Sequence, residues 1–177
     1  MLTFMMQKML FKENEIGKEA KIGIIADSHD NMDAIRKAVE FFNEQNVELV
    51  MHAGDIVSPF TAEVFKNLNC DMILIYGNND GDKLYLKERF RNIGTFYNDP
   101  YIGEIYGKSI AMTHHPEIVE ALAAKHDVVI YGHTHEKEIR EGDAIIINPG
   151  ECCGYLTDIK SVAILYMEKH KAEIFEL

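Results

Sequence analysis

The sequence predicts an α/β fold in which two mixed β-sheets pack as a sandwich flanked by helices. Short apolar segments alternate with helical patterns over the first half of the chain, which is typical of parallel strands joined by crossover helices. The second half is richer in strands at hairpin-like spacing, which indicates antiparallel pairing. Most strand segments are continuously apolar, as in sheets that are covered on both faces.

In the first half, strands are predicted at residues 22–26, 48–53, 72–76 and 95–97, where short apolar runs occur. A helix is predicted between the first two strands, with Asp30 or Asn31 placed to cap it. Its apolar face consists of Met32, Ile35, Val39 and Phe42. A second helix is expected to open at Pro59 and to include Leu68. A third helix is expected over residues 83–91.

In the second half, strands are predicted at residues 101–106, 109–113, 128–131, 137–140, 144–148, 162–167 and 172–175. Turn residues at 98–100 and Gly107 separate the first of these, and a helix is expected over residues 117–125. The chain has no internal repeat and no linker rich in Pro, Gly or Ser. We therefore expect one domain over residues 21–177.

The first twenty residues differ from the rest. Residues 1–11 are apolar but interrupted by Lys8, and residues 12–20 are mostly polar. They lack the long apolar core and the cleavage site of a signal peptide, so we expect a loosely ordered extension or an early start codon. The alternative is a short amphipathic helix used in self-association, which would make the protein a homo-oligomer. No apolar run approaches the ~18 residues of a membrane span, so no membrane partner is expected.

The composition is that of an acidic globular protein. The chain has 177 residues, with 18 Lys and Arg against 29 Asp and Glu, a formal net charge of −11. Such a balance argues against a stable nucleic-acid partner, which requires basic patches, but allows a phosphate-handling enzyme whose bound cations reverse the local field. The cysteines, Cys70, Cys152 and Cys153, are odd in number and two are adjacent. This pattern favours buried thiols in a reducing cytoplasm.

Five predicted strands are each followed at once by residues that can bind metal. These clusters are Asp27-Ser28-His29, Gly54-Asp55, Gly77-Asn78-Asn79-Asp80, His114-His115 and Gly132-His133-Thr134-His135. In open α/β sheets ligands gather beyond the carboxyl ends of the strands, so we expect the five loops to meet at one rim. Five of the eight histidines lie in these loops, a concentration that core packing does not explain.

Dinuclear metal hydrolysis requires such a set, because two cations ~3.5–4 Å apart need a bridging carboxylate, terminal ligands and open positions. Asp27 with His29, and His133 with His135, alternate by two and can each aim at one ion if the backbone bends there. Asp55 is the natural bridge. The neutral oxygen of the Asn78 amide adds no charge, and the mixture of donors suits Mn, Fe, Zn, Ni or Co better than Ca or an all-oxygen Mg site.

The ordered series D-x-H, G-D, G-N-x-D, a strand-end H and G-H-x-H resembles the calcineurin-like metallophosphoesterases. Asn148-Pro149-Gly150 and the short length are most similar to the small YfcE-type phosphodiesterases. The resemblance covers residues 21 to about 167. It implies the metallo-dependent phosphatase fold and a cytoplasmic enzyme that hydrolyses small phosphodiesters with a water or hydroxide activated between two divalent cations. We expect Mn, with Ni, Fe, Zn, Co or Mg as alternatives.

The resemblance also implies a ligand set. One metal would be held by Asp27, His29, Asp55 and His135, and the second by Asp55, Asn78, His114 and His133. Asn79 stands where many relatives have a histidine, and it cannot be a general acid at neutral pH. We expect it to donate to a phosphate oxygen and the enzyme to prefer esters with good leaving groups. His115 stands where relatives often have glycine, and either contacts substrate or fills the turn.

Some relatives of this fold, such as the small retromer subunit, are protein-binding scaffolds with little catalysis, and this is the alternative function. Every expected ligand position here holds a competent residue, which favours an enzyme. His52 is either a partner of a ligand or a hydrogen-bonded core histidine. Asp80 is expected to hold the loop of Asn78 through backbone hydrogen bonds. Glu151 and the two cysteines after it are candidates for the edge of the cleft.

Overall fold

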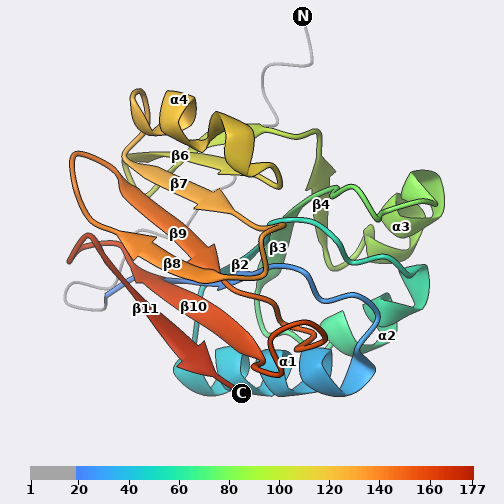
Figure 1. Cartoon of the computed structure of the whole chain (residues 1–177). Coiled ribbons are helices and arrows are strands. Elements are labelled where there is room, and N and C mark those ends of the chain that lie inside the picture. Colours follow the sequence, from blue (N-terminus) through green and yellow to red (C-terminus); the bar gives the residue numbers. More distant parts are fainter. Residues whose placement is uncertain (1–18) are drawn as a thin grey trace, which may run out of the picture.

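Two β-sheets face each other in the computed structural model, which describes residues 19–177, and helices cover the outer face of each sheet (Figure 1). The six-stranded sheet has the order β11-β10-β1-β2-β3-β4 and the five-stranded sheet the order β5-β6-β7-β9-β8. The strands of the first are β1 (Lys21–Ile25), β2 (Leu49–His52), β3 (Asp71–Ile75), β4 (Gly94–Tyr97), β10 (Ser161–Tyr166) and β11 (Lys171–Glu176). Those of the second are β5 (Tyr101–Ile105), β6 (Lys108–Thr113), β7 (Val128–Tyr131), β8 (Lys137–Arg140) and β9 (Ile145–Pro149).

The apolar side chains form three layers of core. One lies between the sheets and joins residues such as Ile24 and Met51 to Met112 and Ile130. A second lies under helices α1 (Met32–Gln45), α2 (Ala62–Phe65) and α3 (Lys83–Phe90). A third, smaller one lies under α4 (Val119–Ala123) on the five-stranded sheet. The strands are therefore buried on both faces, which is why their sequences are continuously apolar. The predicted α/β sandwich flanked by helices is confirmed.

Helix α1 shows how local sequence fixes the elements. The side chain of Asn31 accepts the backbone N–H of Ala34 at 3.2 Å and so caps the helix. Asn46 ends it in the left-handed conformation (φ +54°). Phe42 of α1 packs on Gly23 of β1 so closely that a Cβ there would lie 2.7 Å from its ring. The close packing of Phe42 on β1 therefore depends on the absence of a side chain at Gly23.

Two other predicted helices are shorter than expected. The segment that opens at Pro59 is one 3₁₀ turn, η1 (Pro59–Thr61), followed by α2, and residues 117–125 contain η2 (Pro116–Ile118) followed by α4. Proline begins each 3₁₀ turn because its ring fixes φ and it lacks an N–H to be satisfied.

The predicted strand directions are correct in the first half and wrong in part of the second. Strands β1 to β4 are parallel, and β5–β6, β8–β9 and β10–β11 are antiparallel pairs. However, β6–β7 and β7–β9 are parallel. The segment with η2 and α4 carries the chain back across the sheet between β6 and β7, and β8 takes the edge position, which leaves β9 beside β7.

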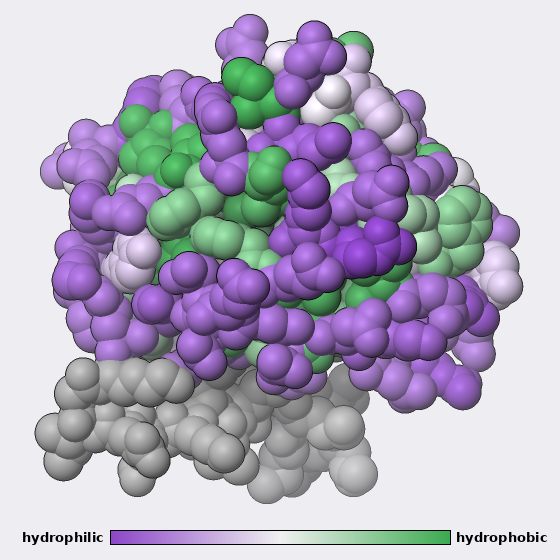
Figure 2. Space-filling model, turned by 90° about the horizontal axis from the view of Figure 1, so that it is seen from below, coloured by the Kyte–Doolittle hydropathy of each residue, from purple (hydrophilic) through white to green (hydrophobic). Residues whose placement is uncertain are grey.

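The structure tests only some of the other predictions about the chain as a whole. Residues 1–18 lie outside the described residues, so the predicted extension over 1–20 and its role in self-association stay predictions, as does the single domain over 21–177. None of the helices in residues 19–177 is long and apolar enough to cross a bilayer. The face in Figure 2 is mainly hydrophilic, with hydrophobic residues in small groups between polar ones.

Candidate metal centre

The five predicted clusters meet at one edge of the sandwich, beyond the carboxyl ends of β1, β2, β3, β6 and β7. The backbone N–H of Asp27 donates to Gly54 O at 3.1 Å, which joins the loops after β1 and β2. Nδ1 of His114, after β6, lies 2.8 Å from Ala53 O, after β2. This contact links the two sheets directly at the site.

Asp27, His29 and His135 form the first group of donor atoms. Asp27 Oδ1 lies 3.8 Å from His29 Nε2 and 3.6 Å from His135 Nε2. The atoms Asp27 Oδ1 and His29 Nε2 are buried and have no hydrogen-bond partner among the described residues. Buried polar atoms almost always have a hydrogen-bond partner. An oxygen and a nitrogen that lack one, beside His135 Nε2, therefore fit a site at which a cation is bound.

His114, His133 and Asn78 form the second group. Asn78 Oδ1 lies 2.9 Å from both His114 Nε2 and His133 Nδ1. Asp55 lies between the groups, because its Oδ2 is 3.4 Å from His114 Nε2 and 3.5 Å from His29 Nε2. All seven residues predicted as metal ligands are thus brought together, and the donor set of imidazole nitrogens, carboxylates and one amide oxygen suits transition-metal ions.

The backbone bends at the site as the spacing of the ligands requires. Five of the seven residues have positive φ: Asp27 (+50°), His29 (+37°), Asp55 (+59°), His133 (+72°) and His135 (+61°). The left-handed conformation costs a non-glycine residue roughly 1–2 kcal/mol, and such strain gathers at functional sites. It brings Asp27 and His29 to the same group of ligand atoms. His133 and His135, which were expected to aim at one ion, instead join different groups, His133 beside Asn78 and His135 beside Asp27.

Two of the histidines are oriented through the ring nitrogen that faces away from the cluster. His114 Nδ1 is bound to Ala53 O, and His135 Nδ1 lies 2.8 Å from Glu151 Oε2. This leaves Nε2 of each ring directed toward the donor groups, as in histidine ligands whose second nitrogen is held by a carbonyl or carboxylate. Glu151, predicted only as a candidate for the edge of the cleft, therefore orients a proposed ligand, a role that the sequence did not indicate.

Glu151 is a buried carboxylate, and both of its oxygens accept hydrogen bonds. It also accepts the backbone N–H groups of Tyr155 and Leu156, the backbone N–H and hydroxyl of Thr157, and the thiol of Cys153. Burial opposes ionisation, but these hydrogen bonds outweigh it and lower the pKa of Glu151 to about 2. Its donors all come from the seven residues that follow it or from His135, so no periodic pattern marks it in the sequence.

Asp80 and Asn79 both support Asp55. Asp80 accepts backbone N–H groups from Gly77, Asp55, Ile56 and Val57, which confirms that it holds this loop in place. The backbone N–H of Asn79 donates to Asp55 Oδ1 at 2.8 Å and its side-chain amide to Oδ2 at 2.7 Å. Burial raises the pKa of Asp55, but hydrogen bonds from His114 and Asn79 hold it well below its usual range. The Asn79 amide thus contacts Asp55, and its predicted contact with a phosphate oxygen stays a prediction.

His52 and His115 lie beside the centre. His52 is buried, with Nε2 3.0 Å from the hydroxyl of Ser28, and burial lowers its pKa to about 3. It is thus a neutral, hydrogen-bonded core histidine. The His115 side chain is 48% exposed, with Nε2 3.9 Å from Asp99 Oδ2. It lines a pocket of about 600 Å³ that Asn78 also lines, so it faces the space next to the second group of donors.

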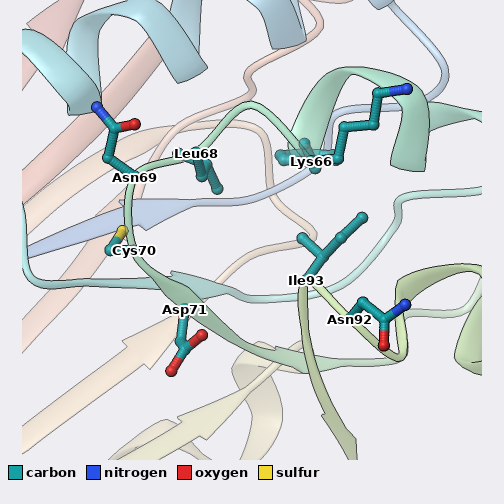
Figure 3. A pocket seen from close by; sticks show the side chains of 8 residues that line it. Lys66, Leu68, Asn69, Cys70, Asp71, Asn92 and Ile93 are labelled. Carbon is teal, nitrogen blue, oxygen red and sulfur yellow. The ribbon is translucent and has the colours of Figure 1, made fainter.

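A smaller pocket of about 260 Å³ lies at the amino ends of β3 and β4, at the opposite end of the strands from the metal centre (Figure 3). Cys70 lines it, and burial raises the pKa of this thiol to about 12. All three cysteines are free, with Cys152 and Cys153 fully buried. The prediction of buried, unbridged thiols is confirmed for these two, while Cys70 is half-buried.

Comparison with known proteins agrees with this geometry. Residues 20–170 match the calcineurin-like phosphoesterase superfamily domain. The chain belongs to this superfamily. Phosphodiesterase MJ0936 of Methanocaldococcus jannaschii is 49% identical over 156 residues, which cover 84% of this chain and 94% of that protein. The structure of an archaeal phosphodiesterase superposes with a TM-score of 0.84 at 45% identity, over 89% of this chain and 99% of the other.

More distant structures share the fold. YfcE, a phosphoesterase from E. coli, has a TM-score of 0.60 at 20% identity, over 82% of this chain and 87% of the other. Vacuolar protein sorting 29 from Cryptosporidium parvum has a TM-score of 0.62 at 15% identity, over 90% of this chain and 97% of the other. The family resemblance predicted from the motifs is confirmed, and membership of a metallophosphoesterase family implies a divalent metal.

Proposed function

We propose that the protein is a metal-dependent phosphodiesterase that hydrolyses small phosphodiesters. Its superfamily and its 49% identity to a phosphodiesterase support this activity. The observation that carries the two-metal form of the proposal is the position of Asp55, whose Oδ2 lies within 3.5 Å of a histidine nitrogen from each donor group. A carboxylate in that position can be shared by two cations.

In this proposal Asp27, His29, Asp55 and His135 hold one cation, and Asp55, Asn78, His114 and His133 hold the other. Bound there, the cations would lower the pKa of a water molecule and offset the charge of the phosphate. The chain supplies three carboxylate or amide ligands in fixed positions. Asn79 helps to keep Asp55 ionised, and Asp80 holds the backbone of Asp55. Ala53 and Glu151 fix the rings of His114 and His135.

The experiment is metal-dependent hydrolysis of bis(p-nitrophenyl) phosphate with and without Mn²⁺, on protein first treated with a chelator. We expect turnover only with metal, two metal ions per chain by elemental analysis, and a loss of both in Asp55→Asn. His133→Ala is expected to lower kcat by at least about 100-fold. His170→Asn, a histidine outside the site, is the control. Well-folded protein that binds Mn²⁺ but hydrolyses no diester would favour the scaffold function instead.

The native metal is proposed to be Mn²⁺, with Ni, Fe, Zn, Co or Mg as alternatives that the elemental analysis distinguishes. The free thiols agree with a cytoplasmic location. Small phosphodiesters are the proposed substrates because no described segment covers the rim as a separate cap, and the acidic charge gives no support for a stable nucleic-acid partner.

A further inference from the structure

A cationic pocket adjoins the candidate metal centre on the side of α3. The pocket of about 600 Å³ described above has walls from the loop after β3, from α3 itself, from the turn before β5, and from the loop after β6. Two of these loops also carry Asn78 and His114, which are proposed ligands. The pocket is therefore close enough to the donor groups for one molecule to reach both.

Lys83 and Lys87 supply the positive charge. They are four positions apart on α3, about 6 Å along the helix axis, so both lie on one face of it. Both line the pocket and both are exposed. Within residues 19–177 neither ammonium group lies within 4 Å of a carboxylate, unlike Arg89 on the same helix, which is paired with Glu63. In a chain of net charge −11, two unpaired cations lining one pocket are available to a ligand.

The neighbours of Lys83 hold it at the pocket. Its Nζ lies 5.2 Å from the centroid of the Tyr76 ring, and Tyr76 Oη donates to the backbone carbonyl of Lys83 at 3.1 Å. Tyr76 stacks on Phe96 at 4.5 Å between centroids. Asp99 is the one carboxylate in the lining, and its Oδ2 accepts the N–H of His114. His115 lies beside Asp99, and the two lysines line the same pocket.

We propose that this pocket binds a second phosphate, carried on one ester arm of the diester substrate. The inference rests on the proposed function and extends it to a substrate class, nucleotide-like diesters that carry a further phosphate on one ester arm. A pocket of about 600 Å³ is large enough for a sugar and a phosphate. Diesters with two uncharged arms would leave both lysines without an anionic partner.

The test compares two chromogenic diesters that differ by one phosphate, thymidine 5′-(p-nitrophenyl phosphate) with and without a 3′-phosphate. Release of p-nitrophenolate by the Mn²⁺-loaded full chain gives kcat/KM for each. We expect the 3′-phosphorylated diester to be favoured about tenfold, mainly through KM, because two partly exposed ion pairs form. In Lys83→Gln/Lys87→Gln this ratio should fall to about one. Lys37→Gln/Lys125→Gln, with the same change in net charge on exposed lysines elsewhere, should keep it.

A second measurement separates this inference from the activity itself. Calorimetry with Mn²⁺-loaded protein compares binding of thymidine 3′,5′-bisphosphate and thymidine 5′-monophosphate, neither of which is a diester. Tighter binding of the bisphosphate that depends on Lys83 and Lys87 supports the pocket even if no diester is hydrolysed, in which case only the proposed function fails. Turnover of both diesters with a ratio near one in the wild type, or equal loss in both double variants, overturns the pocket and leaves the proposed function standing.

Discussion

Asn79 has a contact that bears on the choice of substrate. Its side-chain amide donates to Asp55, and an amide cannot give a proton to a leaving group at neutral pH. We therefore expect aryl diesters to be hydrolysed much faster than alkyl esters. Asn79→His should raise kcat for alkyl diesters by about tenfold or more, because general acid catalysis contributes 10²–10⁴-fold when well placed. The measurement is the ratio of kcat for alkyl and aryl diesters.

Asn79→Ala is the control for that substitution, because it removes the hydrogen bond to Asp55 without adding an acid. If the alanine variant gained as much activity on alkyl diesters as the histidine variant, proton donation would not be the cause. Equal kcat of the wild type on alkyl and aryl diesters would contradict the expected preference for aryl diesters.

Glu151 gives a pH dependence of stability. Its pKa is lowered in the folded protein to about 2, from 4.5, so it stabilises the fold fully above pH 4.5 and loses this effect as the pH falls toward 2. A shift of this size corresponds to about 3 kcal/mol. Glu151→Gln should therefore lower the free energy of unfolding of the metal-free protein by about 2–3 kcal/mol at pH 7, measured by urea denaturation.

The difference between wild type and Glu151→Gln should shrink between pH 4.5 and pH 3. The matched control is Glu104→Gln, since Glu104 is an exposed carboxylate on β5, and it should change the free energy of unfolding little at any pH. If the free energy of unfolding of Glu151→Gln stayed below that of the wild type by the same amount from pH 7 to pH 3, the charge of Glu151 would not be the cause. Altered packing or hydrogen bonding would then account for the loss.

Among the elements, the turn after β2 sets how closely the loops of the two sheets meet. Gly54 has φ +93°, and a Cβ there would lie 2.8 Å from Gly77 N and 2.8 Å from His114 Nδ1. Gly54→Ala must therefore push the loops after β3 and β6 apart. We expect a loss of about 2–4 kcal/mol in stability, from backbone strain and overpacking, and a Mn²⁺ affinity at least about tenfold weaker by calorimetry.

Gly107 offers the matched substitution for this element. It also has positive φ (+73°), but nothing lies within 4 Å of a Cβ built there. Gly107→Ala should show the backbone strain alone and leave Mn²⁺ affinity unchanged. Equal affinities in the two variants would mean that the contacts of Gly54 do not control the spacing of the ligands.

For the whole molecule, the proposed cations should add to stability, because they would bind ligands that come from both sheets and that only the folded chain brings together. At a free Mn²⁺ concentration of 100 times Kd, one site contributes about 2.7 kcal/mol. For a domain of this size that is a rise in Tm of about 5–10 °C. Scanning calorimetry with and without Mn²⁺ measures it, and Asp55→Asn should remove most of the rise. An unchanged Tm in the wild type at saturating Mn²⁺ would argue against binding at this centre.

Most of the fold and the seven clustered residues could be predicted because both depend on short-range patterns. Continuous apolar runs mark doubly covered strands, and polar residues at their carboxyl ends must share one edge. The parallel pairing of β7 and β9 could not be predicted, since it follows from β8 taking the edge position. The contact of Glu151 with His135 and that of Asn79 with Asp55 were also not predicted, because they depend on hydrogen bonds that only the assembled loops define.

Strand β1, the first strand within residues 19–177, is flanked by β2 on one side and by β10, near the end of the chain, on the other. Asp27 at its end shares the site with His135, whose orientation depends on Glu151. A ribosome must therefore release nearly the whole chain before the first cluster of donors can be completed. Pairing at such long separation slows folding, so capture of the cations would be among the last events in maturation. A nascent chain stalled before β9 would lack both Glu151 and β10, the neighbour of β1.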